Sequence, residues 1–108
     1  MSDVRLVLSS FPDQETARRI GRVLVEEGLA ACINLLPGVE SIYRWQGKVE
    51  EGAEVLGIIK TTAGGLQALE RRLAALHPYE VPEVVALDPS AVSASYAEWL
   101  KNSVKLNV

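Results

Sequence analysis

The residues most able to do chemistry lie in the stretch LHPYEVPEV, Leu76 to Val84. It contains the only histidine of the chain, His77, followed by Tyr79, Glu80 and Glu83. An imidazole beside carboxylates can bind a borderline divalent ion such as Cu²⁺ or Zn²⁺. The stretch has no second histidine and no H-E-x-x-H or C-x-x-C spacing, so the simpler interpretation is that His77 ends a helix.

The single cysteine, Cys32, follows two alanines in an apolar segment. In that setting a thiol is more often a small buried hydrophobe than a metal ligand or a nucleophile. With His77 as base and Glu80 as its orienting group, Cys32 could form a nucleophilic site. Spacing alone does not bring these three residues together, and we expect a binding protein and not an enzyme.

Two further segments could contact a ligand. Lys60 precedes two threonines and a glycine-containing turn that could hold an anion, but the G-x-x-x-x-G-K-[ST] pattern is missing. Tyr43 and Trp45 could stack on a ligand, or they could pack across neighbouring strands. A solvated hairpin edge is the expected place of three acidic residues, Glu50, Glu51 and Glu54.

The whole chain limits the class of protein. Its 108 residues, 48% hydrophobic, fit one globular domain spanning 1–108. The net charge is −3 and the basic residues are scattered, which argues against a nucleic-acid partner. No apolar run is long enough to cross a membrane and no signal peptide is recognisable, so we expect no membrane association and a cytoplasmic location. One cysteine cannot form an internal disulfide, which agrees with that compartment.

The order of hydrophobic patterns predicts the elements that must position these residues. We expect strands at 4–10, on either side of a glycine turn at 46–48 within 29–62, and at 82–88. Helices are expected at 13–28, 65–78 and 93–104, with Asp13 as the first N-cap. Residues 105–108 could add a short strand. This βαββαβ order with an extra C-terminal helix predicts an α+β, ferredoxin-like sandwich with both crossover helices on one face of the sheet.

The expected sheet is apolar on both faces. In the segment EVLGIIK, Val55 and Ile59 point to one face, while Leu56 and Ile58 point to the other. Two helices cover only one face of the sheet. A C-terminal helix of about 18 Å is too short to cover the whole of the second face. We therefore expect further copies of the chain to cover the second face.

Several segments, taken together, resemble one known family. LVEEGLAACINLLPGVESIYRWQGKVEE, KTT, LHPYEVPEVVAL and YAEWL occur in this order between about Leu6 and Leu100 and are similar to the CutA divalent-cation-tolerance family. The resemblance implies a homotrimer related in architecture to the PII signalling proteins. It also implies a role in tolerance of copper and other divalent cations, with no required cofactor and a divalent ion, Cu²⁺ or Zn²⁺, as a possible ligand.

The resemblance also implies where a ligand would bind. The positions of the copper ligands proposed for the family are occupied here by Ser9, Leu76 and His77, so only one of the three is a ligand type. The best remaining metal ligands are His77, Cys32 and Glu80. An alternative is a PII-like sensor that binds a small anionic metabolite or a partner protein between subunits. The residues expected to line that intersubunit cleft are Tyr43, Trp45, Lys60, Tyr79, Glu83 and Trp99.

Overall fold

The computed structural model describes residues 3–105. Its elements follow the predicted order and are β1 (Val4–Phe11), α1 (Gln14–Glu26), β2 (Cys32–Trp45), β3 (Lys48–Thr62), α2 (Leu66–Leu76), β4 (Val85–Leu87) and α3 (Ala94–Ser103). The possible strand at 105–108 lies, apart from Lys105, outside the described residues.

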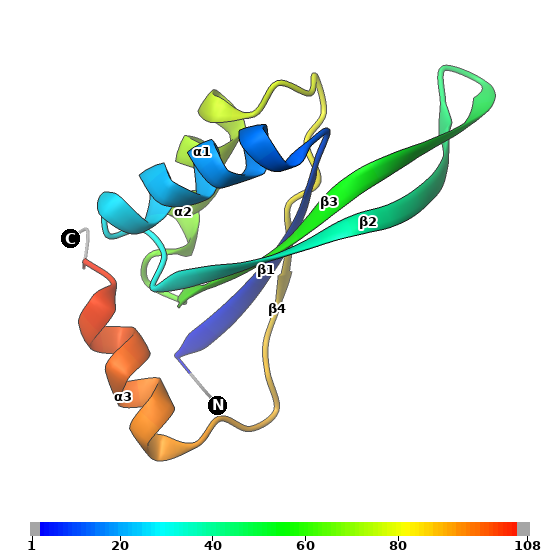
Figure 1. Ribbon diagram of the computed structural model, residues 1–108. Helices are drawn as coiled ribbons and strands as arrows, with labels where there is room; N and C mark the ends of the chain where they lie inside the picture. The colour runs from blue at the N-terminus through cyan, green and yellow to red at the C-terminus, as the bar shows by residue number, and fades with distance from the viewer. Residues whose placement is uncertain (1–2, 106–108) are drawn as a thin grey trace.

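The four strands form one sheet in the order β2-β3-β1-β4, with every neighbouring pair antiparallel. Both α1 and α2 lie on the same face of the sheet (Figure 1). This arrangement confirms the predicted ferredoxin-like sandwich. The pairing of β2 with β3 shifts between Leu36 and Val39, which marks a β-bulge at Pro37 and Gly38, and Gly38 has a φ of 75°.

Local signals set the ends of α1. The Asp13 carboxylate accepts a hydrogen bond from the Thr16 amide at 2.7 Å, as expected of an N-cap. This bond lowers the pKa of Asp13 below its ordinary value of 3.8. Gly28, with a φ of 74°, follows the last turn. Between these ends, Ala17, Ile20 and Leu24 occur at helical spacing and are fully buried.

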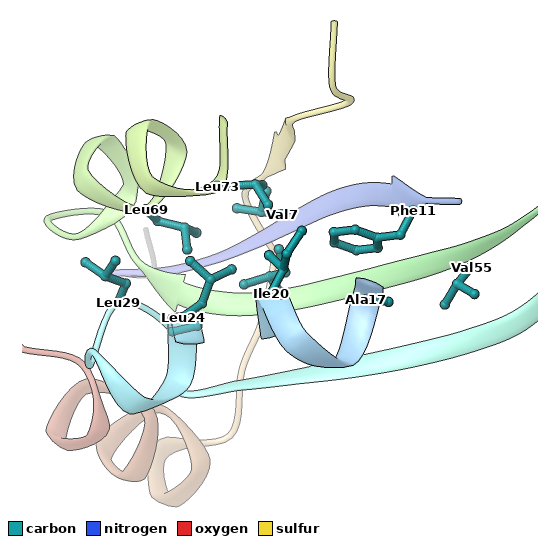
Figure 2. Packing of buried hydrophobic residues seen from close by; sticks show 11 residues of the cluster. Val7, Phe11, Ala17, Ile20, Leu24, Leu29, Val55, Leu69 and Leu73 are labelled. Atoms are coloured by element: carbon teal, nitrogen blue, oxygen red, sulfur yellow. The ribbon is translucent and has the colours of Figure 1, made fainter. Parts of the chain in front are cut away.

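The hydrophobic core fills the space between the two helices and the sheet (Figure 2). Gly57 lets these layers approach closely, because a Cβ atom there would lie 2.8 Å from the Phe11 ring. The largest side chains of this cluster with no exposed surface are Val7, Phe11, Ile20, Leu24, Ile59, Leu69 and Leu73.

The opposite face of the sheet, here called the reverse face, is apolar and largely open. Residues paired across antiparallel strands point to the same face. The pairing therefore defines three rows: Leu36, Leu56 and Ser10; Asn34, Ile58, Leu8 and Val85; and Cys32, Lys60, Leu6 and Leu87. Leu36, Val85 and Leu87 are 41%, 45% and 44% exposed. The second apolar face predicted from the sequence is thus present.

Helix α3 covers only one end of the reverse face. Its buried residue Leu100 packs with Val4, Ala31 and Val104. Tyr96 and Trp99, on the same helix, are 39% and 46% exposed. The helix therefore leaves part of its own aromatic surface, as well as most of the reverse face, uncovered.

Beyond the bulge, β2 and β3 continue as a hairpin that extends past the rest of the sheet (Figure 1). The molecule accordingly measures 43 × 26 × 22 Å. Gln46 and Gly47 both have positive φ, 50° and 78°, as a tight two-residue hairpin turn requires. Ile42 and Val49 on this hairpin are 70% and 62% exposed, so the arm carries apolar groups that the chain itself does not cover.

Candidate functional site

His77 ends helix α2. Its backbone N–H donates to the carbonyl oxygen of Leu73 at 2.9 Å, and its own backbone is extended. The helix-ending interpretation is therefore confirmed. The side chain is only 7% exposed, so the ring points into the protein.

Both ring nitrogens of His77 are engaged. The Tyr79 amide donates to Nδ1 at 3.1 Å, so Nδ1 carries no proton and Nε2 donates to the Ser10 carbonyl oxygen at 2.8 Å. The ring also stacks on Phe11, with 5.1 Å between centroids and 18° between planes. A metal ion could bind His77 only if one of the two hydrogen bonds were broken.

Tyr79 is tied to the β2–β3 hairpin. Its hydroxyl donates to Glu54 Oε2 at 2.6 Å. Burial, and then this hydrogen bond to a carboxylate, raises the pKa of Tyr79 well above its usual range. The expectation that Glu54 belongs to a solvated edge was wrong. The two-residue period of β3 could have revealed this position, because it places Glu54 on the same face of the sheet as Leu56 and Ile58.

A groove with a cavity volume of about 830 Å³ lies between the β2–β3 hairpin and the segment 78–83. We call it the acidic groove. Ser10 donates to Glu83 at 3.3 Å along this groove. Of the predicted site residues, the structure brings five to the groove: Tyr43, Trp45, Tyr79, Glu80 and Glu83. Sequence reasoning missed Glu40 and Glu54, which also line it.

The other candidates gather at the opposite end of the reverse face. Cys32 Sγ lies 3.8 Å from the Tyr96 hydroxyl, and Lys60 Nζ lies 5.8 Å from the centroid of the Tyr96 ring. The Tyr96 and Trp99 rings are 5.4 Å apart. Lys60 is six residues along β3 from Glu54, which corresponds to about 20 Å in a strand. One chain therefore does not bring Lys60 and Trp99 to Tyr79 and Trp45.

The nucleophilic site considered from the sequence is not assembled within one chain. Cys32 lies on the reverse face, where it pairs across the strands with Lys60. His77 instead packs on Phe11, on the face of the sheet that the helices cover. Among residues 3–105, no three histidine, cysteine, aspartate or glutamate side chains lie close enough to hold a metal ion. Ser9, at one of the family's ligand positions, is fully buried, and its hydroxyl has no hydrogen-bond partner in the described part of the chain.

Comparisons with known proteins agree on one family. A sequence model described as "CutA1 divalent ion tolerance protein" matches residues 5–103. The chain is 49% identical over 98 residues to the divalent-cation tolerance protein CutA of Thermus thermophilus, covering 91% of this chain and 95% of that protein. Among solved structures, CutA from Xylella fastidiosa superposes with a TM-score of 0.93 at 46% identity, covering 96% and 100% of the two chains. CutA1 from Oryza sativa superposes with a TM-score of 0.94 at 42% identity, covering 98% and 97%.

Relatives are named for different compartments. An Arabidopsis thaliana relative, 44% identical, is named "Protein CutA, chloroplastic"; the match covers 93% of this chain and 55% of that protein. A solved structure from Archaeoglobus fulgidus is described as periplasmic. Within the described residues, none of the helices is long and apolar enough to span a membrane. The cytoplasmic location accordingly stays a prediction.

Proposed function

The chain belongs to the CutA1 divalent ion tolerance family, and on this premise we propose that it is a divalent-cation-tolerance protein that works as a homotrimer and binds a divalent ion, Cu²⁺ or Zn²⁺. The observation that carries the proposal is the open, apolar reverse face. The names of its relatives refer to tolerance of divalent ions, and binding of such an ion is the means that we propose. In this proposal the protein is not an enzyme and needs no resident cofactor.

The reverse face supports assembly because water disfavours its exposed side chains. Covering what remains exposed of Leu36, Val85 and Leu87 would contribute about 1 kcal/mol for each residue, given about 1.5–3 kcal/mol for full burial. The hairpin adds Ile42 and Val49, which are more exposed still. A second copy of the chain carries a matching apolar surface, and the number three follows from the family resemblance.

A divalent ion would need donors from more than one copy, since one described chain lacks a three-ligand cluster. Glu80 is exposed and has no ion-pair or hydrogen-bond partner within residues 3–105, and the Cys32 thiol is only half-buried. These two side chains can reach an ion without rearrangement. His77 would first have to give up a hydrogen bond.

The alternative of a sensor for a small anion has less support. The residues that line the acidic groove include four glutamates and no lysine or arginine. Lys60, the residue expected to attract the anion, lies beside Tyr96 and not beside Tyr79. An anion in this groove would meet repulsion.

Assembly can be tested with Val85→Lys, which places a charge on the reverse face. Light scattering should show that this variant dissociates at least a hundredfold more readily, because a buried charge without a partner costs about 3 kcal/mol or more and 1.4 kcal/mol is tenfold. Gln67→Lys adds the same charge to the exposed surface of α2 and should leave the mass unchanged. A Val85→Lys protein that assembles like the unmodified one would remove the reverse face from the interface.

Ion binding can be tested by calorimetry with Cu²⁺ and Zn²⁺. Cys32→Ser and Glu80→Gln should each weaken binding by about tenfold, as expected for the loss of one charged contact. Saturable binding that neither variant changes would exclude both residues as ligands.

A further inference from the structure

The β2–β3 hairpin extends beyond the sheet from a well-defined root (Figure 1). β1 pairs with β3 only as far as Phe11 and Val55, so residues 39–54, here called the arm, have no third strand of the described chain beside them. Both strands enter the arm at the pair of Val39 and Glu54, directly after the bulge in β2. Val55 is buried, whereas the arm beyond its root is almost wholly exposed. The arm is thus a two-stranded ribbon held at one end, and such a ribbon is only marginally stable by itself.

One side-chain contact ties the root of the arm to the body of the fold. The Tyr79 hydroxyl donates to Glu54 Oε2 at 2.6 Å. Within residues 3–105, no other side-chain hydrogen bond or ion pair joins the arm to the rest of the chain. Burial, and then this bond, raises the pKa of Tyr79, so the hydroxyl keeps its proton and remains a donor. The direction of the arm at its root therefore depends on where Tyr79 is held.

Tyr79 belongs to a segment, 78–83, that is fixed at both ends to Ser10 of β1. We call this segment the strap. Just before it, His77 Nε2 donates to the Ser10 carbonyl oxygen at 2.8 Å, and at its end the Ser10 hydroxyl donates to Glu83 at 3.3 Å. The Tyr79 amide donates to His77 Nδ1 at 3.1 Å, and the two rings lie 4.7 Å apart. The two prolines of the strap restrict its backbone further. The strap therefore holds Tyr79 at a fixed position relative to β1.

The arm carries apolar groups on both of its faces. By the strand pairing, Ile42 and Val49 share one face, and Tyr43 and Trp45 share the other. All four side chains are between 39% and 70% exposed. The face of Trp45 is also that of Glu54, so it continues the reverse face of the sheet. A second copy of the chain that covers the reverse face would therefore meet the arm as well.

We propose that the strap sets the direction of the arm for docking with a second copy of the chain, and that the hydrogen bond from Tyr79 to Glu54 is its latch. The inference rests on the proposed function for the identity of the partner. From root to turn the arm is about six residues, or about 20 Å, so a tilt of about 10° at the root moves the turn by about 3.5 Å. Interface cores are packed as densely as protein interiors, and a shift of this size would separate their contacts. Tyr79 is accordingly a positioning residue for assembly.

Tyr79→Phe removes the latch and leaves the ring in place. Sedimentation should show that this variant dissociates at a concentration different from that of the unmodified protein, higher by about fivefold, as expected for the loss of a partly exposed hydrogen bond to a carboxylate. Amide hydrogen exchange across residues 39–54 should become faster by about the same factor. Glu54→Ala should have the same effects. The double variant should be no weaker than either single one, because both changes remove the same bond.

Thr61→Val is the matched control. It also removes one hydroxyl, whose hydrogen bond to the Leu29 carbonyl oxygen, 2.7 Å long, lies outside the arm. It should destabilise the fold without changing assembly or the exchange of the arm. The proposal is overturned if Tyr79→Phe changes neither readout, if Thr61→Val changes them as much, or if the effects of Tyr79→Phe and Glu54→Ala add. A monomeric unmodified protein in which Tyr79→Phe still speeds exchange would overturn the proposed assembly and support the strap as the device that orients the arm.

Discussion

Replacing His77 tests whether this histidine holds the structure together or binds an ion. Its ring joins the end of α2 to β1 through the hydrogen bond to the Ser10 carbonyl. The same ring is joined to the segment after α2 by the hydrogen bond that it accepts from the Tyr79 amide. His77→Ala removes both bonds and the stacking on Phe11, and it leaves a cavity where a buried ring was.

The expected loss follows from these contacts. Each intramolecular hydrogen bond contributes about 1 kcal/mol net, and the stacked ring pair adds about 0.5–1.5 kcal/mol. His77→Ala should therefore lower the free energy of unfolding by about 3 kcal/mol. His77→Gln, which keeps one donor and one acceptor, should lose less. Relative to a typical domain stability of about 5–15 kcal/mol, the alanine variant still folds.

Urea unfolding at a fixed protein concentration, with a chelator present, measures this loss independently of any metal ion. Calorimetry with Cu²⁺ on the folded His77→Gln protein is the second readout, and its affinity should stay within about threefold of the unmodified protein. The reasoning is refuted if His77→Ala unfolds within about 0.5 kcal/mol of the unmodified protein. A tenfold or larger loss of Cu²⁺ affinity in folded His77→Gln would instead make His77 a ligand.

Three further predictions concern the fold and the groove. The pKa of Asp13 is lowered in the folded protein, so the ionised Asp13 carboxylate stabilises the fold. This stabilisation is fully present above pH 3.8, the ordinary pKa, and is lost as the pH falls through the lower pKa of the folded protein. Asp13→Asn, which keeps a capping side chain, should remove that part of the acid dependence of the unfolding free energy, measured in urea titrations. Gly57→Ala should cost about 1–3 kcal/mol in thermal or urea unfolding, since its Cβ would meet the Phe11 ring, whereas Gly52→Ala, with no atom within 4 Å of the added Cβ, should cost much less. Tyr79→Phe should lower the unfolding free energy by about 1 kcal/mol in the same assay, because a partly exposed hydrogen bond to Glu54 is lost, and an unchanged value would show that this bond contributes nothing.

The fold was predictable because its signals are local and repetitive. Asp13 and Gly28 mark the ends of α1, and both behave in the structure as their residue types suggest. The two-residue period of β3 separated Val55 and Ile59 from Leu56 and Ile58, which the structure places on opposite faces. A strand alternates by geometry, so its faces can be assigned before its partners are known.

The lining of the groove was predictable where residue types stand out, as with Tyr43 and Trp45, or where the residues lie close together in sequence. Tyr79, Glu80 and Glu83 follow one another, and they do line one groove. Glu54 was missed because it is 25 residues from Tyr79, and only the folding of the hairpin against the segment after α2 brings them together. Lys60 and Tyr79 were expected to line one cleft between subunits; within one chain, Lys60 lies six residues along β3 from Glu54, the hydrogen-bond partner of Tyr79. Such distances depend on tertiary structure, which residue types alone do not specify.

The central claim is that further copies of the chain cover the reverse face. Sedimentation velocity on the unmodified protein, over concentrations from about 1 to 100 μM, tests it most directly. The account predicts one species of three times the 11.7 kDa chain mass across this range. A single species of 11.7 kDa at the highest concentration would contradict it.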